Sequence, residues 1–267
     1  MSLRLHPGIK NIFLPYSPFH AARSLLLVQV VIAFTLWSLH STRVLPSPAE
    51  ISLAWIKLFN EQALLQELWA SVKVLLLSLL ISTGIALLIA AASTAPIFLP
   101  LARFASVLRF LGFAGLSYLF MLLTSDGYEL KLALLTFGTS VMMVTALMAE
   151  VQAIPQDAID HCKTLGMRNW RITYELVLLG KADTLLDLVR QNAAIGWTLL
   201  TMVEGLTRSE GGIGALLLNQ NRYFQLSGVF AIQISILFYG VAQDYLLAQL
   251  RQMLCPYVNY THNENAP

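Results

Sequence analysis

Charged side chains are scarce in this chain of 267 residues: Asp, Glu, Lys and Arg make up 12%, against 57% hydrophobic residues. A soluble protein of this size needs many more charged side chains to cover its surface. The composition therefore excludes a cytosolic enzyme, a nucleic-acid-binding protein and a disordered scaffold. It predicts an all-α fold, a polytopic bundle of helices in a lipid bilayer.

Metal-binding and catalytic motifs are also lacking. The two cysteines, Cys162 and Cys255, belong to no CxxC or His-rich pattern, which favours free thiols in a reducing compartment. All five histidines fall in tails, at a span edge or in a loop, so no pair can bind a metal within the bilayer. We expect no metal site and no catalytic residue, which makes an intramembrane enzyme the least favoured class.

A phosphate-binding loop is missing as well. The only Gly-Lys pair, Gly180-Lys181, is followed by Ala182, and Glu175 stands where the loop's first glycine belongs. The chain is therefore not expected to bind ATP or any other cofactor itself.

Six largely uncharged runs are long enough to cross a bilayer, and the fifth is the most polar. They cover residues 24–42, 74–95, 105–125, 132–149, 185–204 and 223–243. The expected transmembrane domain is 24–254, between tails at 1–23 and 255–267. With the N-terminus inside, inner segments hold eleven Lys and Arg and outer segments six, which favours two cytoplasmic termini. In the third run, Gly112 and Gly115 allow a bend or a close helix approach.

Two connections are too long to be simple turns. The outer one, 46–73, carries Ile51, Trp55, Leu58 and Phe59 at helical spacing, and we expect a short amphipathic helix that packs on the bundle. The inner one, 150–183, is the most polar part of the chain.

The inner connection has the signals of two short helices. Pro155 and Asp157 suit the first turn of a helix and Gly166 its left-handed end. One face of this helix is apolar, formed by Ala158, Ile159, Cys162 and Leu165. A second helix is expected from Asn169, as N-cap, to about Gly180.

The segment from Asp160 to Gly166, with Trp170 and Leu178-Leu179-Gly180 after it, resembles the coupling loop of bacterial ABC importer permeases. The family pattern is Glu-Ala-Ala, three residues, Gly, and a later Leu-Pro. Here Asp160, His161 and Cys162 occupy the first three places, and Leu179 replaces the proline. Gly180 can end the second helix instead.

Further similarity to the family extends over roughly Pro46 to Met253. It includes Leu45-Pro46-Ser47-Pro48, Glu204 with Gly212-Ile213-Gly214, Val229-Phe230-Ala231 and Asp244. The chain is most similar to the subgroup that imports nitrate, sulfonates, taurine, bicarbonate or pyrimidine precursors of thiamine.

The resemblance implies a permease subunit for a small polar, anionic solute, with no enzymatic activity of its own. The loop helix would dock on a separate ATPase that uses ATP and Mg²⁺, through Ala158, Ile159, Asp160, His161, Cys162, Leu165 and Gly166. The implied assembly has two permease copies as a homodimer, two ATP-binding subunits and an extracytoplasmic solute-binding protein, in a bacterial inner membrane. That protein would face the outer helix and the loop 208–226, which contains Gly212 and Gly214. No nucleic-acid partner is expected.

Polar residues within the fifth run are candidates for the solute path: Gln191, Asn192, Trp197 and Glu204. Each also has a structural interpretation. The amides can join helices, Trp197 can pack in the core, and Glu204 can anchor a loop. Arg190 is expected to reach the inner head groups, and Asp244 to face a basic residue of a neighbouring loop.

An ion-coupled carrier or a channel is the alternative function. A carrier is usually built from inverted repeats or broken helices with buried carboxylates, and the sequence shows neither clearly.

Overall fold

The computed structural model describes residues 19–39, 46–94, 97–111 and 113–256, and in these ranges the fold is all-α, as predicted. In chain order the elements are α2 (Phe19–Leu39), α3 (Pro48–Glu61), α4 (Leu64–Ser93), α5 (Leu99–Val107), the 3₁₀ turn η1 (Leu108–Phe110), α6 (Phe113–Leu123), α7 (Gly127–Gln152), α8 (Gln156–Thr164), α9 (Asn169–Thr173), the π-helix η2 (Tyr174–Leu179), α10 (Ala182–Leu206), the 3₁₀ turn η3 (Arg208–Glu210), α11 (Ile213–Arg222) and α12 (Leu226–Leu254).

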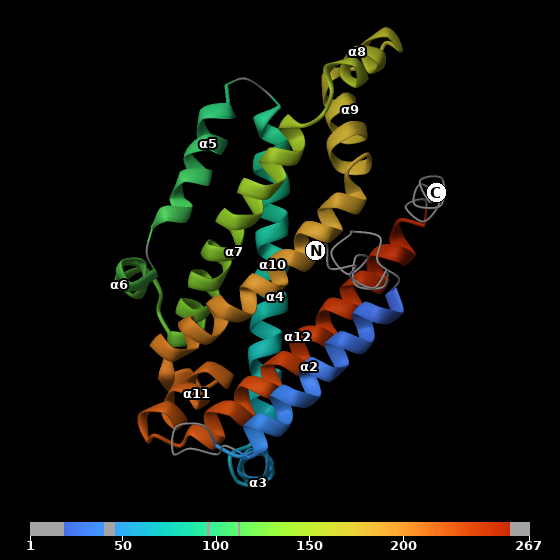
Figure 1. The fold of residues 1–267 in the computed structure, drawn as a ribbon. Coiled ribbons are helices and arrows are strands. Elements are labelled where there is room, and N and C mark those ends of the chain that lie inside the picture. The colour runs from blue at the N-terminus through green and yellow to red at the C-terminus, as the bar shows by residue number, and fades with distance from the viewer. Residues whose placement is uncertain (1–18, 40–45, 95–96, 112, 257–267) are drawn as a thin grey trace, which may run out of the picture.

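The long helices form a bundle with different short elements at its two ends (Figure 1). The α8 end carries α8 and α9, and the α11 end carries α3 and α11. Helix α10 crosses the bundle from one end to the other. The two ends of the bundle can thus be told apart by their short helices, and candidate residues lie at both ends.

Helices α4 and α7 share the most extensive contact in the described bundle. Small side chains line the buried face of α4, and two of their hydroxyls, those of Ser78 and Ser82, donate to backbone carbonyls one turn earlier. Small residues let two helix backbones approach closely when no water is present to drive their association. The α4–α7 pair is therefore the centre on which the other helices pack.

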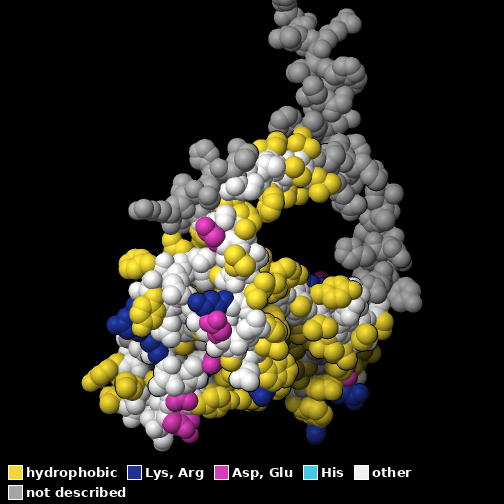
Figure 2. Space-filling view, turned by 90° about the horizontal axis from the view of Figure 1, so that it is seen from below, with side chains coloured by type: hydrophobic (Ala, Val, Ile, Leu, Met, Phe, Trp, Pro, Cys, Tyr) yellow, Lys and Arg dark blue, Asp and Glu magenta, His cyan; other side chains and the backbone are white. Residues whose placement is uncertain are grey.

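The core has two parts. Toward the α11 end, Leu68, Leu75, Leu135, Leu200 and Ile232 belong to one buried cluster. Toward the α8 end, a second cluster includes Ala86, Ala102, Met143 and Leu147. Outside these clusters, large hydrophobic side chains are exposed on most helices. Figure 2 shows them over much of the surface seen from the α11 end, which is the expected surface of a protein in lipid.

Three described helices are long and apolar enough to cross a membrane: α4 with 30 residues, α7 with 26 and α12 with 29. A fourth is counted if α5–η1 and α6 are taken as one span. Helix α10 is long enough, but Asp183, Asp187, Arg190 and Glu204 make it too polar to be counted with them. The six-span arrangement stays a prediction, and the structure supports three to four spans by length and composition.

The third expected span differs most from its prediction. The expected span 105–125 is not one straight helix, because the axes of 99–110 and 115–123 meet at 116°. The phenyl rings of Phe120 and Phe137 lie 5.8 Å apart, which packs α6 against α7. The bend falls in the segment with Gly112 and Gly115, where the sequence allowed one. Gly112 itself lies outside the described residues.

The other expected spans agree with single helices, apart from their ends. Helix α4 begins at Leu64, before the expected residue 74, and α2 begins at Phe19, inside the expected tail. Helix α12 begins at Leu226, three residues after the expected start of the sixth span, and extends to Leu254, beyond its expected end at residue 243. Residues 40–42 and 95 lie outside the described residues. The expected outer helix is α3, with Ile51 and Leu58 buried.

The start of α3 follows from three residues. Pro48 occupies the first turn, the Ser47 hydroxyl accepts a hydrogen bond from the Glu50 amide, and the Glu50 carboxylate accepts one from the Ser47 amide. This reciprocal cap satisfies two backbone donors and fixes where the helix begins. The Trp55 indole then donates to the Ser235 hydroxyl at 2.9 Å, which ties α3 to α12.

A close approach between α10 and α4 yields the first prediction. A Cβ atom at Gly196 would lie 2.6 Å from Leu75 Cδ1, and Leu75 is fully buried, so its side chain would have to shift within a packed core. Gly196→Ala is therefore expected to lower the free energy of unfolding by about 1–3 kcal/mol, the usual cost of overpacking. Denaturation in mixed detergent micelles measures it.

Gly84→Ala is the matched control, because Gly84 lies in α4 with open space around the added Cβ. This variant is expected to unfold like the parent protein or slightly later, since alanine favours a helix over glycine. Equal stability of the two variants would contradict the close approach.

Candidate functional site

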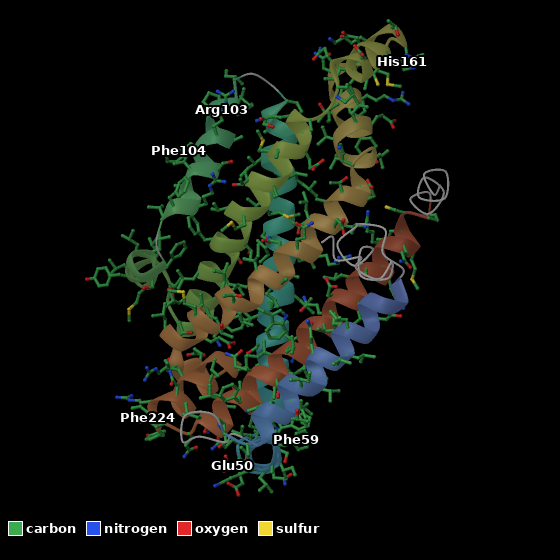
Figure 3. The ribbon with its side chains drawn as sticks, in the orientation of Figure 1. Glu50, Phe59, Arg103, Phe104, His161 and Phe224 are labelled. Atoms are coloured by element: carbon green, nitrogen blue, oxygen red, sulfur yellow. The ribbon has the colours of Figure 1, made fainter. Side chains whose placement is uncertain are left out.

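The candidate residues separate into a group at the α8 end, a group at the α11 end and a group along α10. At the α8 end, α8 and α9 extend beyond the bundle as an elbow, defined here as residues 155–173 (Figure 1). His161 lies near its tip (Figure 3). Among the described elements, only α9 makes substantial contact with α8. Helix α8 is thus a projection that packs mainly on α9, whereas α9 reaches the end of α4, where the Thr173 hydroxyl donates to the Thr94 hydroxyl at 3.2 Å.

The limits of α8 agree with the prediction. Pro155 is the N-cap, and Gly166 has φ +73°, in the left-handed region that favours glycine. The Gly166 amide donates to the Lys163 carbonyl at 2.9 Å and the Met167 amide to the Cys162 carbonyl at 3.2 Å. These two bonds close the helix and turn the chain toward α9.

The faces of α8 differ in part from the prediction. Cys162 is buried and Ala158 and Ile159 are half-buried, but Leu165 is 62% exposed and does not share their covered side. The physical reason is that Leu165 follows the last helical residue, where the chain has begun to turn. Leu165 therefore faces outward from the elbow, as does Trp170, which is 67% exposed.

The polar residues of α8 are on its outer side. The Lys163 ammonium donates to the Asp160 carboxylate at 2.9 Å. This hydrogen bond and the positive charge hold the pKa of Asp160 below its ordinary value. Asp160 therefore stays ionised at neutral pH, and with exposed His161 it gives the elbow a polar surface beside Leu165.

The second expected helix is present with two changes. Its N-cap is Arg168 rather than Asn169, and the α-helix gives way to a π-helix at Tyr174. It ends at Gly180, as expected, and the Gly180 amide donates to the Glu175 carbonyl at 2.8 Å. The ion pair of Lys181 and Glu150, with a nitrogen–oxygen distance of 3.0 Å, fixes the start of α10 on the end of α7.

At the α11 end the structure brings together Glu204, Gly212 and Gly214, three residues that the sequence singled out. Glu204 is fully buried, and its carboxylate accepts hydrogen bonds from the Ser71 hydroxyl at 2.6 Å and the Gly214 amide at 2.8 Å. Glu204 therefore holds the loop 211–214 against α4 and α10. It has the position of an anchor for this loop, and it lines none of the five described cavities.

The counter-charge of Glu204 is Lys131 of α7. Lys131 is only 3% exposed, and its ammonium lies 3.5 Å from the Glu204 carboxylate and donates to the Gly211 carbonyl at 2.9 Å. The Glu67 carboxylate of α4 accepts a hydrogen bond from the Gly212 amide. The ion pair and its hydrogen bonds thus join α4, α7, α10 and α11, and we call this group the Glu204 cluster.

Glycine is required in the loop of this cluster. Gly212 has φ +106°, and a Cβ atom there would lie 2.3 Å from the Glu204 carboxylate. A Cβ atom at Gly214 would lie 2.5 Å from the Thr201 carbonyl oxygen, on the backbone of α10. The backbone of the loop approaches α10 too closely for any side chain.

Sequence reasoning missed Lys131, Ser71 and Glu67. Lys131 is one of the six basic residues counted for the outer segments, directly before the run 132–149. A lysine at the start of a long apolar run, with a glutamate at the end of another, was a signal that the two could pair at one end of the bundle.

The remaining candidates lie along α10 and are not gathered in one place. Gln191 is exposed, whereas Asn192 is buried and donates to the Thr139 carbonyl at 3.0 Å, which joins α10 to α7. Trp197 is buried, and its indole donates to the Gln243 side chain of α12 at 2.8 Å. Of the four candidates in the fifth run, only Trp197 lines a described cavity, one between α10 and α12.

Arg190 and Asp244 also differ from expectation. Asp244 faces Arg190 of α10, at 2.9 Å between guanidinium nitrogen and carboxylate oxygen, and not a residue of a neighbouring loop. Arg190 is therefore held by this carboxylate and by Asp187 at 3.5 Å. Arg251 of α12 lies 3.2 Å from Asp187 and extends the same set of ion pairs.

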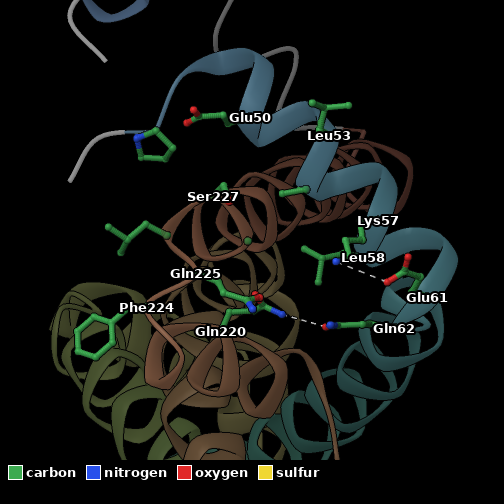
Figure 4. A pocket seen from close by; sticks show the side chains of 14 residues that line it. Glu50, Leu53, Lys57, Leu58, Glu61, Gln62, Gln220, Phe224, Gln225 and Ser227 are labelled. Carbon is green, nitrogen blue, oxygen red and sulfur yellow. Dashed lines mark hydrogen bonds and ion pairs between the residues drawn. The ribbon is translucent and has the colours of Figure 1, made fainter. Parts of the chain in front are cut away.

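A groove of about 840 Å³ opens at the α11 end between α3 and the α11–α12 junction (Figure 4). The amides of Gln62 and Gln220 are hydrogen-bonded across it at 3.0 Å. Lys57 and Glu61 form an exposed ion pair along α3. The structure thus places the expected outer helix and part of the loop 208–226 on one polar surface.

No protein-family model and no curated protein match this sequence. Among the described residues, no group of three or more His, Cys, Asp or Glu is placed to hold a metal ion. The similarity to ABC importer permeases therefore depends on the residues quoted above.

The Glu204 cluster yields the second prediction. Glu204→Gln keeps the side chain's size but leaves the buried Lys131 ammonium without a counter-charge. Breaking one partner of a buried ion pair typically costs about 3–5 kcal/mol, and we expect a loss of that order in the free energy of unfolding. Denaturation in mixed micelles measures the loss.

The double variant Glu204→Gln, Lys131→Met is the control, since it removes both charges. The double variant is expected to lose clearly less stability than the summed losses of Glu204→Gln and Lys131→Met, because no unpaired charge remains buried in it. Additive losses would contradict a functional pairing of the two side chains.

Proposed function

We propose that this chain is the membrane-spanning permease subunit of an ATP-driven importer for a small polar solute. The observation that carries the proposal is the elbow, a short helix that projects from the bundle and bears the segment that resembles the family's coupling loop. Helix α8 packs mainly on α9, so its outer side is available for another protein. In the proposal that partner is a separate ATPase, which uses ATP and Mg²⁺.

The exposed residues of the elbow support this interpretation. Leu165 and Trp170 are large, apolar and mostly exposed, and the elbow also carries the exposed polar residues Asp160 and His161. A central apolar anchor with a polar surround is typical of protein interfaces. Gly166, at the bend, sets the angle between the two helices.

Helix α10 offers a physical route from the elbow to the opposite end. It follows the elbow through η2, and its 25 residues correspond to about 37 Å at 1.5 Å per residue. Its far end carries Glu204, which holds the loop 211–214. A displacement of the elbow would therefore be transmitted by one rigid helix to the Glu204 cluster, as alternating access requires.

The proposed assembly has two permease copies, two ATP-binding subunits and an extracytoplasmic solute-binding protein, in a bacterial inner membrane with both termini cytoplasmic. In this proposed assembly, α2 and α10 also cross the membrane, in addition to the three or four helices that are long and apolar enough to do so. The polar groove between α3 and the α11–α12 junction is the docking surface proposed for the solute-binding protein. Its hydrogen-bonding amides and mixed charges suit a transient protein contact.

An ion-coupled carrier is the second candidate, because α5 and α6 are bent by 116° as the broken helices of carriers are. The buried carboxylate of Glu204 argues for the importer instead. It already pairs with Lys131 and accepts two hydrogen bonds, so a coupling ion would have to compete with these partners.

Gly166 provides the main test. Gly166→Val places a β-branched residue at φ +73° and should reorient the elbow, whereas Gly166→Asn tolerates the left-handed conformation. With the chain and its co-purifying ATPase in proteoliposomes, ATP-dependent uptake of radiolabelled taurine or bicarbonate should fall at least about tenfold for Val and less than about twofold for Asn. Uptake that persists without ATP would contradict the proposal.

The exposed anchors provide a separate test of docking. Leu165→Ala with Trp170→Ala removes apolar surface that the bundle does not use, so the chain should keep its thermal stability. Co-purification of the ATPase should fall at least about tenfold, as expected when central apolar anchors are removed. The matched control is Leu101→Ala with Phe104→Ala on α5, equally exposed but away from the elbow, which should leave the association unchanged.

A further inference from the structure

A hollow of about 820 Å³ lies at the α8 end, between the elbow, η2 and the ends of α4 and α7. Its walls are mainly apolar and include Ala91, Val151, Ile154, Ile159, Ile172 and Leu176. We call this space the elbow hollow. A concave and mostly apolar site of this size, with a few polar groups, is typical of sites for small molecules.

The elbow hollow continues the lipid-facing surface of α4. This helix is long and apolar enough to cross a membrane, and its last turn lines the hollow through Ala91. Leu88, three residues earlier on the same side of the helix, is 73% exposed. Acyl chains of the surrounding lipid therefore reach the hollow along α4, whereas its apolar walls give water few partners.

The polar side chains of the hollow suit a lipid head group. Lys163, Asn169 and Tyr174 line it and are exposed. The Lys163 ammonium has three hydrogens and uses one on Asp160, in an exposed ion pair that is worth little in water. It can therefore also donate to a phosphate oxygen, as can the Asn169 amide and the Tyr174 hydroxyl. The elbow holds three basic residues against two acidic ones, which favours an anionic head group.

The π-helix η2 forms one wall of the hollow, through Leu176. Its wide turn is shown by the hydrogen bond from the Gly180 amide to the Glu175 carbonyl, five residues earlier. π-Helices are rare and are found mostly at functional sites. Because η2 joins the elbow to α10, a molecule in the hollow contacts the elbow, this junction and the ends of α4 and α7 at once. It would keep the elbow at a fixed distance from the bundle.

We propose that the elbow hollow binds an acyl chain of an anionic phospholipid, with the head group at Lys163 and Asn169. The bound lipid supports the elbow in its described position, since the apolar walls cannot close while a chain lies between them. It thereby activates ATP-driven uptake. The binding is independent of the proposed function, whereas the activation rests on it.

Lipid binding to the full chain alone, without any ATPase, tests the site. The protein in mild detergent is titrated with dioleoylphosphatidylglycerol or dioleoylphosphatidylcholine, which share their acyl chains and differ in net charge. Native mass spectrometry counts the bound lipids. The first phosphatidylglycerol is expected to bind at least about tenfold more tightly than the first phosphatidylcholine.

Variants assign the binding to the hollow. Ala91→Phe fills the apolar space and should weaken the first phosphatidylglycerol at least about tenfold, whereas Ala242→Phe, at an exposed position of α12, should not. Lys163→Gln should reduce the preference for phosphatidylglycerol to less than about threefold. Lys57→Gln on α3 is its matched control, because Lys57 also forms an exposed ion pair, and it should keep the preference. Lys163→Gln changes only an exposed side chain, so it tests the site even if Ala91→Phe does not fold.

The activation is measured in proteoliposomes with the co-purifying ATPase. ATP-dependent uptake of radiolabelled taurine or bicarbonate should be at least about fivefold faster with phosphatidylglycerol than with phosphatidylcholine alone, within the usual range of allosteric coupling. Lys163→Gln should remove most of this difference, and Lys57→Gln should retain it.

Equal binding of the two lipids, or phosphatidylglycerol binding that both Ala91→Phe and Lys163→Gln leave intact, would overturn the site. Displacement of the bound lipid by the ATPase would make the hollow a docking surface for that protein and overturn the activation. Failure of the proposed function is distinct, because it would appear as uptake without ATP by a chain that still binds phosphatidylglycerol in the hollow.

Discussion

The buried ion pair between Lys131 and Glu204 is the constraint on which the rest of this structure depends. Two charges removed from water are tolerable only when they face each other and their remaining hydrogen-bonding capacity is used. Ser71, the backbone of the loop 211–214 and the close packing of four helices meet that requirement. The positions of α4, α7, α10 and α11 at this end of the bundle are therefore fixed together, not one by one.

The two ends of the molecule are built on opposite physical principles. At the α11 end, glycines bring a loop onto buried charges, and no side chain could be added without a clash. At the α8 end, the elbow has open space around Gly166 and large exposed side chains. Helix α10 joins the projecting α8 end to the rigid α11 end. This arrangement suits a protein in which a displacement at the α8 end has to change the structure at the α11 end.

Much of the fold could be predicted from composition and local signals. The all-α class follows from scarce charge, and the limits of α8 follow from Pro155 and Gly166, whose backbone preferences are local. The bend between α5 and α6 was allowed by glycine but not required, because its angle depends on packing against α7. The exposure of Leu165 was missed, since helical periodicity does not hold past the last turn.

The candidate site was predictable only in part, for the same reason. By itself the sequence determined the helices, their caps and a set of unusual residues, including Glu204, Gly212 and Gly214, because these depend on neighbours along the chain. Only the tertiary structure decided that Lys131 is the partner of Glu204, and that Arg190, Gln243 and Asp244 share a cavity with Trp197. Lys131 and Glu204, and likewise Arg190 and Asp244, are far apart in sequence, and their contacts exist only once the helices have packed.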